Sequence, residues 1–172
     1  TSTHHERAEQ GSWVYEIPEA GYNYRLTDMQ CALGMSQLEK LPEWVERRRE
    51  IAAQYDAAFA DVDAVEPIAV REDSTCAYHL YVIQLDLNML SVGREEVFDA
   101  LHAEGIGVNV HYIPVHYHPF YRENFDTGEG LCPVAEGAYE RILTLPVFPR
   151  MTDADVSDVI KAVKKVINAY RR

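Results

Sequence analysis

Two short stretches of the sequence concentrate side chains that can bind anions, hydroxyl groups or rings. The first, segment 21–30, places Asn23 and Arg25 just ahead of a helix start. An amide and a guanidinium are suited to phosphate or carboxylate recognition. Thr27 and Gln30 have the spacing of a capping box, so we expect a helix to begin there. The segment is a candidate binding loop, although a surface loop whose tyrosines pack on the domain fits the same residues.

The second stretch, segment 109–121, holds three histidines, three tyrosines and two prolines at the end of a predicted strand and in the loop after it. Aromatic faces stack on rings, and imidazole and amide groups bond hydroxyls, which favours a sugar or nucleotide site. A metal site is an alternative, with His111, His116 and His118 as ligands and Cys132 as a fourth, but the spacing matches no named metal motif. A third possibility is that some of these histidines only pack or cap.

Composition narrows the classes of protein. The chain has 172 residues, enough for one domain with a core, and it is 47% hydrophobic and 26% charged. A net charge of -12 argues against a nucleic-acid-binding surface. No stretch is apolar and long enough to span a membrane. Three widely separated cysteines without metal-type spacing favour a reduced, cytoplasmic setting.

The lysines bear on covalent catalysis. There are four, Lys40, Lys161, Lys164 and Lys165, and all occur in charged, helical contexts. A lysine that forms a Schiff base is usually desolvated, or placed beside another cation, so that its pKa falls. None of the four fits that description, and we assign no catalytic residue to this chain.

Periodicity and punctuation predict the elements that would position these residues. We expect two helices in a long arm, one over 27–41 and one that starts at Pro42 and runs to about 62, and later helices over 93–104, over 134–141 and from Thr152 onward. We expect strands over 78–85, with His79 as a core residue, over 106–112 and over 142–145, with 63–77 as a connection and 113–132 as a long loop. The chain would then divide into a lead-in and active-site loop (1–26), a helical arm (27–62) and a small α/β (α+β) domain (63–172). In that domain helices cover one face of a small sheet.

Taken together, several collinear segments strongly resemble the DegT/DnrJ/StrS family of sugar aminotransferases. The resemblance covers nearly everything after about residue 13. It rests on the opening segment 21–30 and on the segments Ala32-Leu33-Gly34, Ser36-Gln37-Leu38, Arg47-Arg48-Arg49, Tyr78-His79-Leu80-Tyr81, Gly105-Ile106-Gly107, Val110-His111-Tyr112, Leu145-Pro146 and Phe148-Pro149. Segments 30–34 and 111–116 look most similar to the branch that makes UDP-4-amino-4,6-dideoxy-N-acetyl-altrosamine, an intermediate of pseudaminic acid.

The resemblance implies a fold-type I enzyme that depends on pyridoxal 5'-phosphate and works as a homodimer. Such an enzyme transfers an amino group, usually from glutamate, to a keto group of a nucleotide-linked sugar; here we expect the 4-keto group of a UDP-linked deoxysugar. In that family the Schiff-base lysine lies in a large N-terminal domain. The resemblance therefore implies that this chain is the small C-terminal domain and is inactive alone.

Some residue roles are implied by position in the family's pattern. Asn23 matches the asparagine that reaches across the dimer to the cofactor phosphate or the substrate. Asn109, Val110, His111 and Tyr112 match a segment that lines the sugar-nucleotide site. Arg25 and His116 are adjacent substrate-binding candidates. A different class of function, a non-catalytic α/β binding or assembly module, is also compatible with the acidic charge and the long arm.

Overall fold

Thr27 caps the first helix in the computed structural model, which describes residues 20–172. The described residues divide into two units between Glu39 and Lys40. In the first unit, helix α2 (Asp28–Phe59) begins where the sequence predicts. Its capping box is closed, because the Gln30 backbone N–H donates to Thr27 Oγ1 at 3.3 Å and the Thr27 N–H donates to Gln30 Oε1 at 2.9 Å. Most of the predicted lead-in, residues 1–19, lies outside the described residues.

Helix α2 passes through Pro42 without a break, so the prediction of two separate helices is wrong. Proline has no N–H to donate, and inside a helix it costs about 3 kcal/mol. The helix nevertheless continues because its second half is held by packing, with Ile51, Tyr55 and Phe59 fully or almost fully buried. Tertiary burial thus outweighs a local helix-breaking signal.

The second unit is built on a three-stranded antiparallel sheet in the order β1-β2-β3. Strand β2 (Tyr81–Leu85) is central and pairs Ile83 with Leu143 of β3 (Ile142–Leu145). Strand β1 (Val65–Pro67) was predicted only as a connection, because three residues that end in proline carry little strand signal. Strand β2 also begins later than predicted, and His79 therefore lies before it and is exposed, so the interpretation of His79 as a core residue is wrong.

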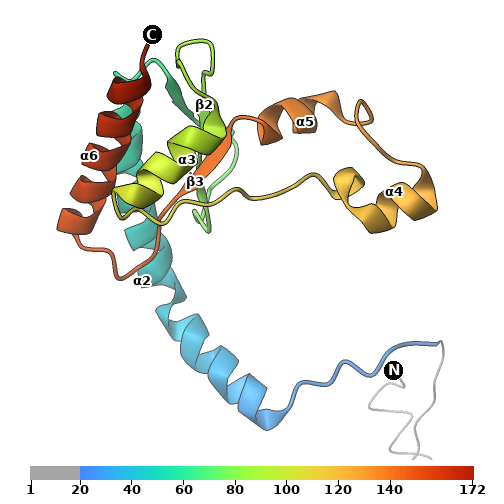
Figure 1. Ribbon diagram of the computed structural model, residues 1–172. Coiled ribbons are helices and arrows are strands. Elements are labelled where there is room, and N and C mark those ends of the chain that lie inside the picture. Colours follow the sequence, from blue (N-terminus) through green and yellow to red (C-terminus); the bar gives the residue numbers. More distant parts are fainter. Residues whose placement is uncertain (1–19) are drawn as a thin grey trace, which may run out of the picture. The chain divides into compact units, whose positions relative to one another are not determined.

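Helices α3 (Arg94–Ala103) and α6 (Asp153–Tyr170), together with the second half of α2, enclose the core against one face of the sheet (Figure 1). Alternate residues of β2 are buried, and the Tyr81 ring lies 4.9 Å from that of Tyr55 on α2. Helix α6 starts at the predicted capping box of Thr152 and Asp155. The predicted α+β fold, a small sheet with helices on one face after a long helical arm, is confirmed.

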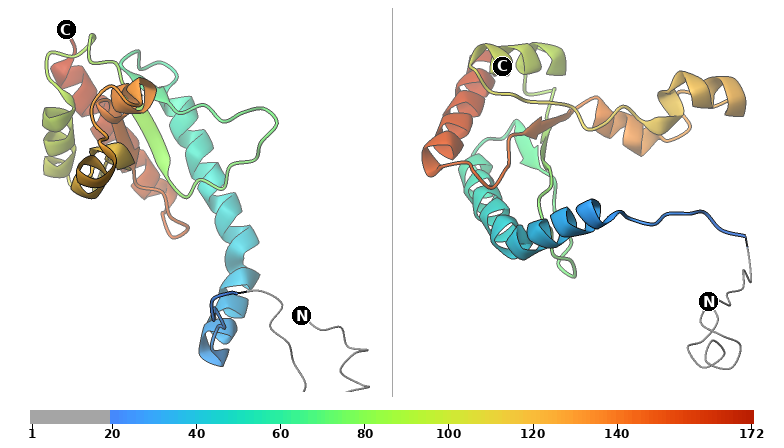
Figure 2. Two further views of the ribbon diagram at one scale, coloured as in Figure 1. Left: turned by 90° about the vertical axis from the view of Figure 1, so that its right-hand side faces the viewer. Right: turned by 90° about the horizontal axis from the view of Figure 1, so that it is seen from below.

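Two predictions about residues 106–132 are wrong. The segment 106–112 is not a strand, because Asn109 alone forms a β-bridge, to Thr144. The predicted loop after it contains a 3-10 turn, η1 (Val115–Tyr117), and helix α4 (Pro119–Phe125). Together with α5 (Pro133–Tyr139), these elements extend away from the sheet (Figures 1 and 2). Among the helices that the structure describes, none is long and apolar enough to cross a membrane.

Candidate functional site

The segment that carries most of the predicted site residues is fastened to the free edge of strand β3. Asn109 and Thr144 exchange two backbone hydrogen bonds, with N–O distances of 3.2 and 2.7 Å. Thr144 is buried in β3, while Asn109 is exposed and its Oδ1 accepts the Val110 N–H at 2.8 Å. A single β-bridge therefore fixes the start of the segment without making it a strand.

His111 is oriented by the same threonine. Its Nδ1 lies 2.9 Å from Thr144 Oγ1, and its ring is packed edge-on against Tyr112, with 4.5 Å between the ring centres. The Tyr112 ring itself is 69% exposed. Val110 packs against the hydrophobic core and offers no polar side chain. The structure thus brings Asn109 and His111 together on Thr144 and presents the Tyr112 ring to solvent, where it can stack on a flat ligand.

His116 is placed differently, since it is 8% exposed and bound within the protein. Its Nε2 lies 2.8 Å from Oε1 of Glu136, on helix α5. Its ring lies edge-on to that of Tyr117, at 4.6 Å between centres. The sequence predicted His116 as a ligand-binding residue, and the structure adds that one of its two ring nitrogens already has a protein partner.

Glu136 is the most heavily bonded carboxylate of this region. Its two oxygens accept the backbone N–H of Gly130 and of Cys132 at distances of 2.9 to 3.0 Å, in addition to the contact with His116. The N–H groups of Cys132 and Gly130, and then the His116 ring, hold the pKa of this carboxyl below its usual value. Glu136 is therefore ionised at neutral pH.

Asn23 and Arg25 lie in the first unit, directly before α2. Both are exposed, as are all described residues of that unit. Tyr22 and Tyr24 beside them stack on each other, with ring centres 5.3 Å apart. No side-chain hydrogen bond joins Asn23 or Arg25 to another residue of the range 20–172, and both side chains are exposed.

Sequence reasoning missed two residues of this region, Thr144 and Glu136. Thr144 is the one polar residue of an otherwise apolar strand, which is a usable signal for a buried hydroxyl with a partner. Glu136 lies in the first turn of a short helix that starts with Pro133, a position where an acidic residue commonly accepts backbone N–H groups. Neither signal identifies His111 or His116 as the partner.

The alternative of a histidine metal site finds no support in the described part of the chain. Residues 20–172 contain no group of three or more histidine, cysteine, aspartate or glutamate side chains that could hold a metal ion. Of the four proposed ligands, His111 faces Thr144 and His116 faces Glu136.

The four lysines all lie on helix surfaces. Lys161 pairs with Asp158 at 3.1 Å and Lys165 with Glu104 at 2.7 Å. Lys164 is half-buried and Lys40 is exposed, with its Nζ 5.9 Å from the centre of the Trp44 ring. A lysine that attaches a carbonyl cofactor is usually desolvated, and none of these four lysines is buried.

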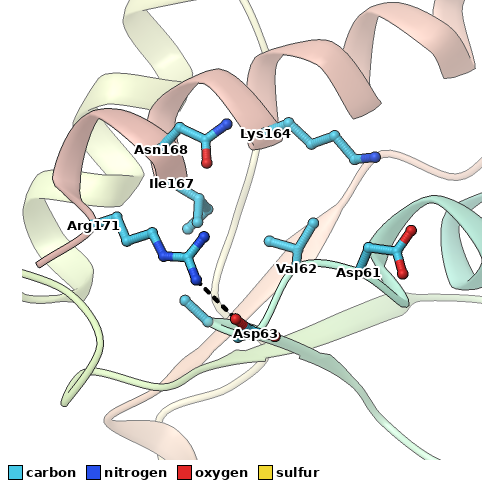
Figure 3. Close-up of a pocket in the computed structure, with 8 residues that line it drawn as sticks. Asp61, Val62, Asp63, Lys164, Ile167, Asn168 and Arg171 are labelled. Atoms are coloured by element: carbon cyan, nitrogen blue, oxygen red, sulfur yellow. Dashed lines mark hydrogen bonds and ion pairs between the residues drawn. The ribbon is translucent and has the colours of Figure 1, made fainter.

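A cavity of about 160 Å³ lies between the end of α2 and helix α6, away from every predicted site residue (Figure 3). Asp61 and Asp63 line one side, and Lys164, Asn168 and Arg171 line the other. Arg171 already pairs with Asp63 at 2.8 Å across the cavity. We interpret it as a surface crevice across which this ion pair links the segment after α2 to the end of α6.

Comparison with known proteins relates nearly the whole sequence of this chain to one family. The sequence profile of the DegT/DnrJ/EryC1/StrS aminotransferase family matches residues 2–164. The spore coat polysaccharide biosynthesis protein SpsC of Bacillus subtilis is 43% identical over 158 residues, which are 91% of this chain and 41% of SpsC. The chain spans about two fifths of the length of the curated relatives it matches.

Solved structures show the same fold. PseC of Helicobacter pylori, an aminotransferase involved in the biosynthesis of pseudoaminic acid, is 28% identical with a TM-score of 0.80, and the match covers 92% of this chain and 42% of PseC. The sugar aminotransferase Spr1654 of Streptococcus pneumoniae, in its PMP-form, is 28% identical with a TM-score of 0.81, over 98% of this chain and 42% of Spr1654. Spr1654 has also been solved in a PLP-form.

Proposed function

This chain belongs to the DegT/DnrJ/EryC1/StrS aminotransferase family, and we propose that it forms the C-terminal part of a sugar aminotransferase that depends on pyridoxal 5'-phosphate. The observation that carries the proposal is the collinear match over residues 2–164 together with the shared fold of two solved aminotransferases. The part of its relatives that this chain does not span would supply the lysine that attaches the cofactor. The chain alone is then inactive.

The proposed substrate is a UDP-linked deoxysugar with a keto group at carbon 4, and the proposed amino donor is glutamate. The similarity to PseC favours a substrate of the pseudaminic acid type. Related enzymes of one family differ in small pocket contacts, and such contacts decide which sugar is accepted. We propose that the enzyme acts in the cytoplasm, where nucleotide sugars of this kind would be made.

Pyridoxal phosphate carries the amino group between donor and acceptor. Asn23 fits its phosphate, because an exposed amide supplies donors for an anion, and the exposed guanidinium of Arg25 is proposed to bind the substrate, as Asn23 also can. Residues 20–39 are all exposed, including the large apolar Met29 at 83% and Leu33 at 62%. Such a surface supports a contact with a second subunit, and we propose that Asn23 acts in the site of a partner subunit in a homodimer.

Asn109, His111, Tyr112 and His116 are proposed to bind the sugar nucleotide. Asn109 and His111 are pre-positioned on Thr144, so their orientation costs little when a ligand arrives. The exposed Tyr112 ring is suited to stacking, and its pairing with His111 limits its rotation. Val110 contributes by packing, which holds the segment on the core.

Two measurements test the proposal. In the full-length gene product, isothermal titration calorimetry with UDP-sugars should show binding. Glutamate should be converted to more than one equivalent of 2-oxoglutarate per cofactor only when a 4-keto sugar nucleotide is present to accept the amino group. Borohydride reduction of this chain with pyridoxal phosphate, followed by intact-mass analysis, should give no stoichiometric adduct. A single adduct at one lysine of this chain would contradict the proposal that the cofactor-attaching lysine lies in another part of the protein.

A non-catalytic assembly module is the second candidate, favoured by the exposed apolar residues at the start of α2. The same calorimetry separates the two functions. Heat from UDP-sugar binding by the full-length protein supports the aminotransferase. A protein that binds no sugar nucleotide and does not turn over glutamate would be an assembly module.

A further inference from the structure

The carboxylate of Glu136 ties together two places in the chain that are more than a dozen residues apart. His116 contacts Oε1 at 2.8 Å, and Gly130 and Cys132 donate their backbone N–H groups to the same carboxylate. A second tie reinforces the first, because Thr127 Oγ1 donates to the His116 carbonyl at 2.9 Å. The segment from His116 to Cys132 is thus closed into a loop at its base.

These polar ties carry most of what fixes the loop, since apolar packing contributes little. None of the residues of α4 is buried, and Phe120 and Phe125 are 62% and 63% exposed. Helix α5 likewise buries none of its residues. A segment with few buried apolar contacts opens easily unless specific hydrogen bonds hold it. The residue that collects those hydrogen bonds therefore fixes where His116 lies relative to Gly130 and Cys132.

The charge state of Glu136 also decides where the proton of His116 lies. An ionised carboxylate is an acceptor only, so the hydrogen in the contact belongs to Nε2 of His116. Tyr117 also lies near this carboxylate, and burial, followed by the charges of Glu136 and Glu129, raises its pKa, so it remains a neutral phenol. Within the described residues, the carboxylate forms its one side-chain ion-pair contact with His116. A neutral His116 therefore carries its hydrogen on Nε2 and leaves Nδ1 as a hydrogen-bond acceptor.

We propose that Glu136 is a positioning residue of the candidate sugar-nucleotide site, which closes the loop 116–132 and sets the Nε2–H form of His116. The identity of the ligand rests on the function proposed above. The closure of the loop and the protonation of the ring do not, because both follow from contacts inside this chain.

The first experiment measures imidazole nitrogen shifts of the ¹⁵N-labelled chain by NMR, for the wild type, Glu136→Gln and the matched control Glu129→Gln. We expect His116 to be protonated at Nε2 in the wild type and in Glu129→Gln. In Glu136→Gln the amide oxygen can remain at the position of Oε1, where the N–H groups of Cys132 and Gly130 require an acceptor, so His116 should keep its hydrogen on Nε2 although the charge of residue 136 is lost. A wild-type His116 protonated at Nδ1 overturns the proposal, and this result needs no variant to fold.

The second experiment follows backbone hydrogen exchange in the same three proteins. Hydrogen bonds to a charged group contribute about 1.5–3 kcal/mol, so Glu136→Gln should speed exchange at Gly130 and Cys132 by about tenfold to a hundredfold. Amides of the sheet, such as that of Ile83, should exchange as in the wild type. Unchanged exchange at Gly130 and Cys132 would mean that Glu136 does not hold the loop.

In the full-length gene product, Glu136→Gln should raise KM for the nucleotide sugar more than it lowers kcat, because it displaces a binding segment. If kcat falls while KM for the nucleotide sugar stays unchanged, Glu136 does not have the proposed positioning role. If the NMR and exchange results hold while the wild type binds no sugar nucleotide, the proposed function fails and the role of Glu136 in the loop stands.

Discussion

Replacing Thr144 by valine separates the orientation of His111 from the fold that carries it. The substitution keeps the shape of the side chain and removes only Oγ1, the partner of His111 Nδ1 at 2.9 Å. The β-bridge to Asn109 uses backbone atoms of residue 144 and should survive. Valine is also favoured in strands, so β3 itself should be unharmed. The perturbation is therefore local to the candidate site.

Its magnitude follows from burial on the two sides of the bond. Thr144 is buried, but His111 is only half-buried, so water can replace the lost partner of the ring. A net hydrogen bond contributes about 0.5–1.5 kcal/mol, and we expect a loss near the middle of that range. For a domain of this size each 1 kcal/mol lowers Tm by about 2–4 °C. If the same energy is lost from a bound state that needs His111 oriented, Kd rises about fivefold.

The assay compares Thr144→Val with two control variants. Thr144→Ser keeps the hydroxyl and should retain affinity for a UDP-sugar in the full-length product. Tyr55→Phe removes a fully buried hydroxyl that donates to the Pro146 carbonyl at 2.9 Å and forms no hydrogen bond with the site segment, and it should cost about 1–3 kcal/mol of stability without changing affinity. Calorimetry and thermal melts give both quantities. The reasoning is refuted if Thr144→Val binds as tightly as Thr144→Ser, or if Tyr55→Phe weakens binding as much as Thr144→Val.

Three further predictions concern pH, backbone conformation and the first unit. Burial, and then the hydrogen bond to Asp56 at 2.6 Å, raise the pKa of Tyr81. The stability that comes from this shift is complete below the ordinary tyrosine pKa of about 10 and is lost as the pH rises beyond it. Above a pH of about 10, Tm should therefore fall less steeply with pH in Tyr81→Phe than in the wild type. Gly105 follows α3 at φ +81°, so Gly105→Ala should lower the free energy of unfolding by more than about 1 kcal/mol. Gly107 has an ordinary φ, and Gly107→Ala should lower it far less; chemical denaturation measures both changes. Asn23→Ala should weaken cofactor or substrate retention in the full-length product while circular dichroism stays unchanged; unaltered retention would remove Asn23 from the site.

Local sequence signals determined much of the fold. The apolar stripe from Val156 to Ile167, with a capping box at Thr152, predicted α6, and the run Ile142–Leu145 predicted β3. Gly105 ended α3 where expected. These signals depend on residues within a few positions of each other, so one sequence is enough to detect them. The collinear motifs also identified the family, because many short matches in order are specific.

Contacts between distant residues decided the rest. Pro42 stayed inside a helix because burial further along α2 outweighed it. His111 and Thr144 are 33 residues apart, and His116 and Glu136 are 20 apart. The sequence predicted both histidines as ligand-binding residues but could not predict that each already has a protein partner. The first pair forms only when the segment at Asn109 lies on the edge of the sheet, and the second only when the turn at His116 lies beside helix α5. No local pattern of residues encodes either approach.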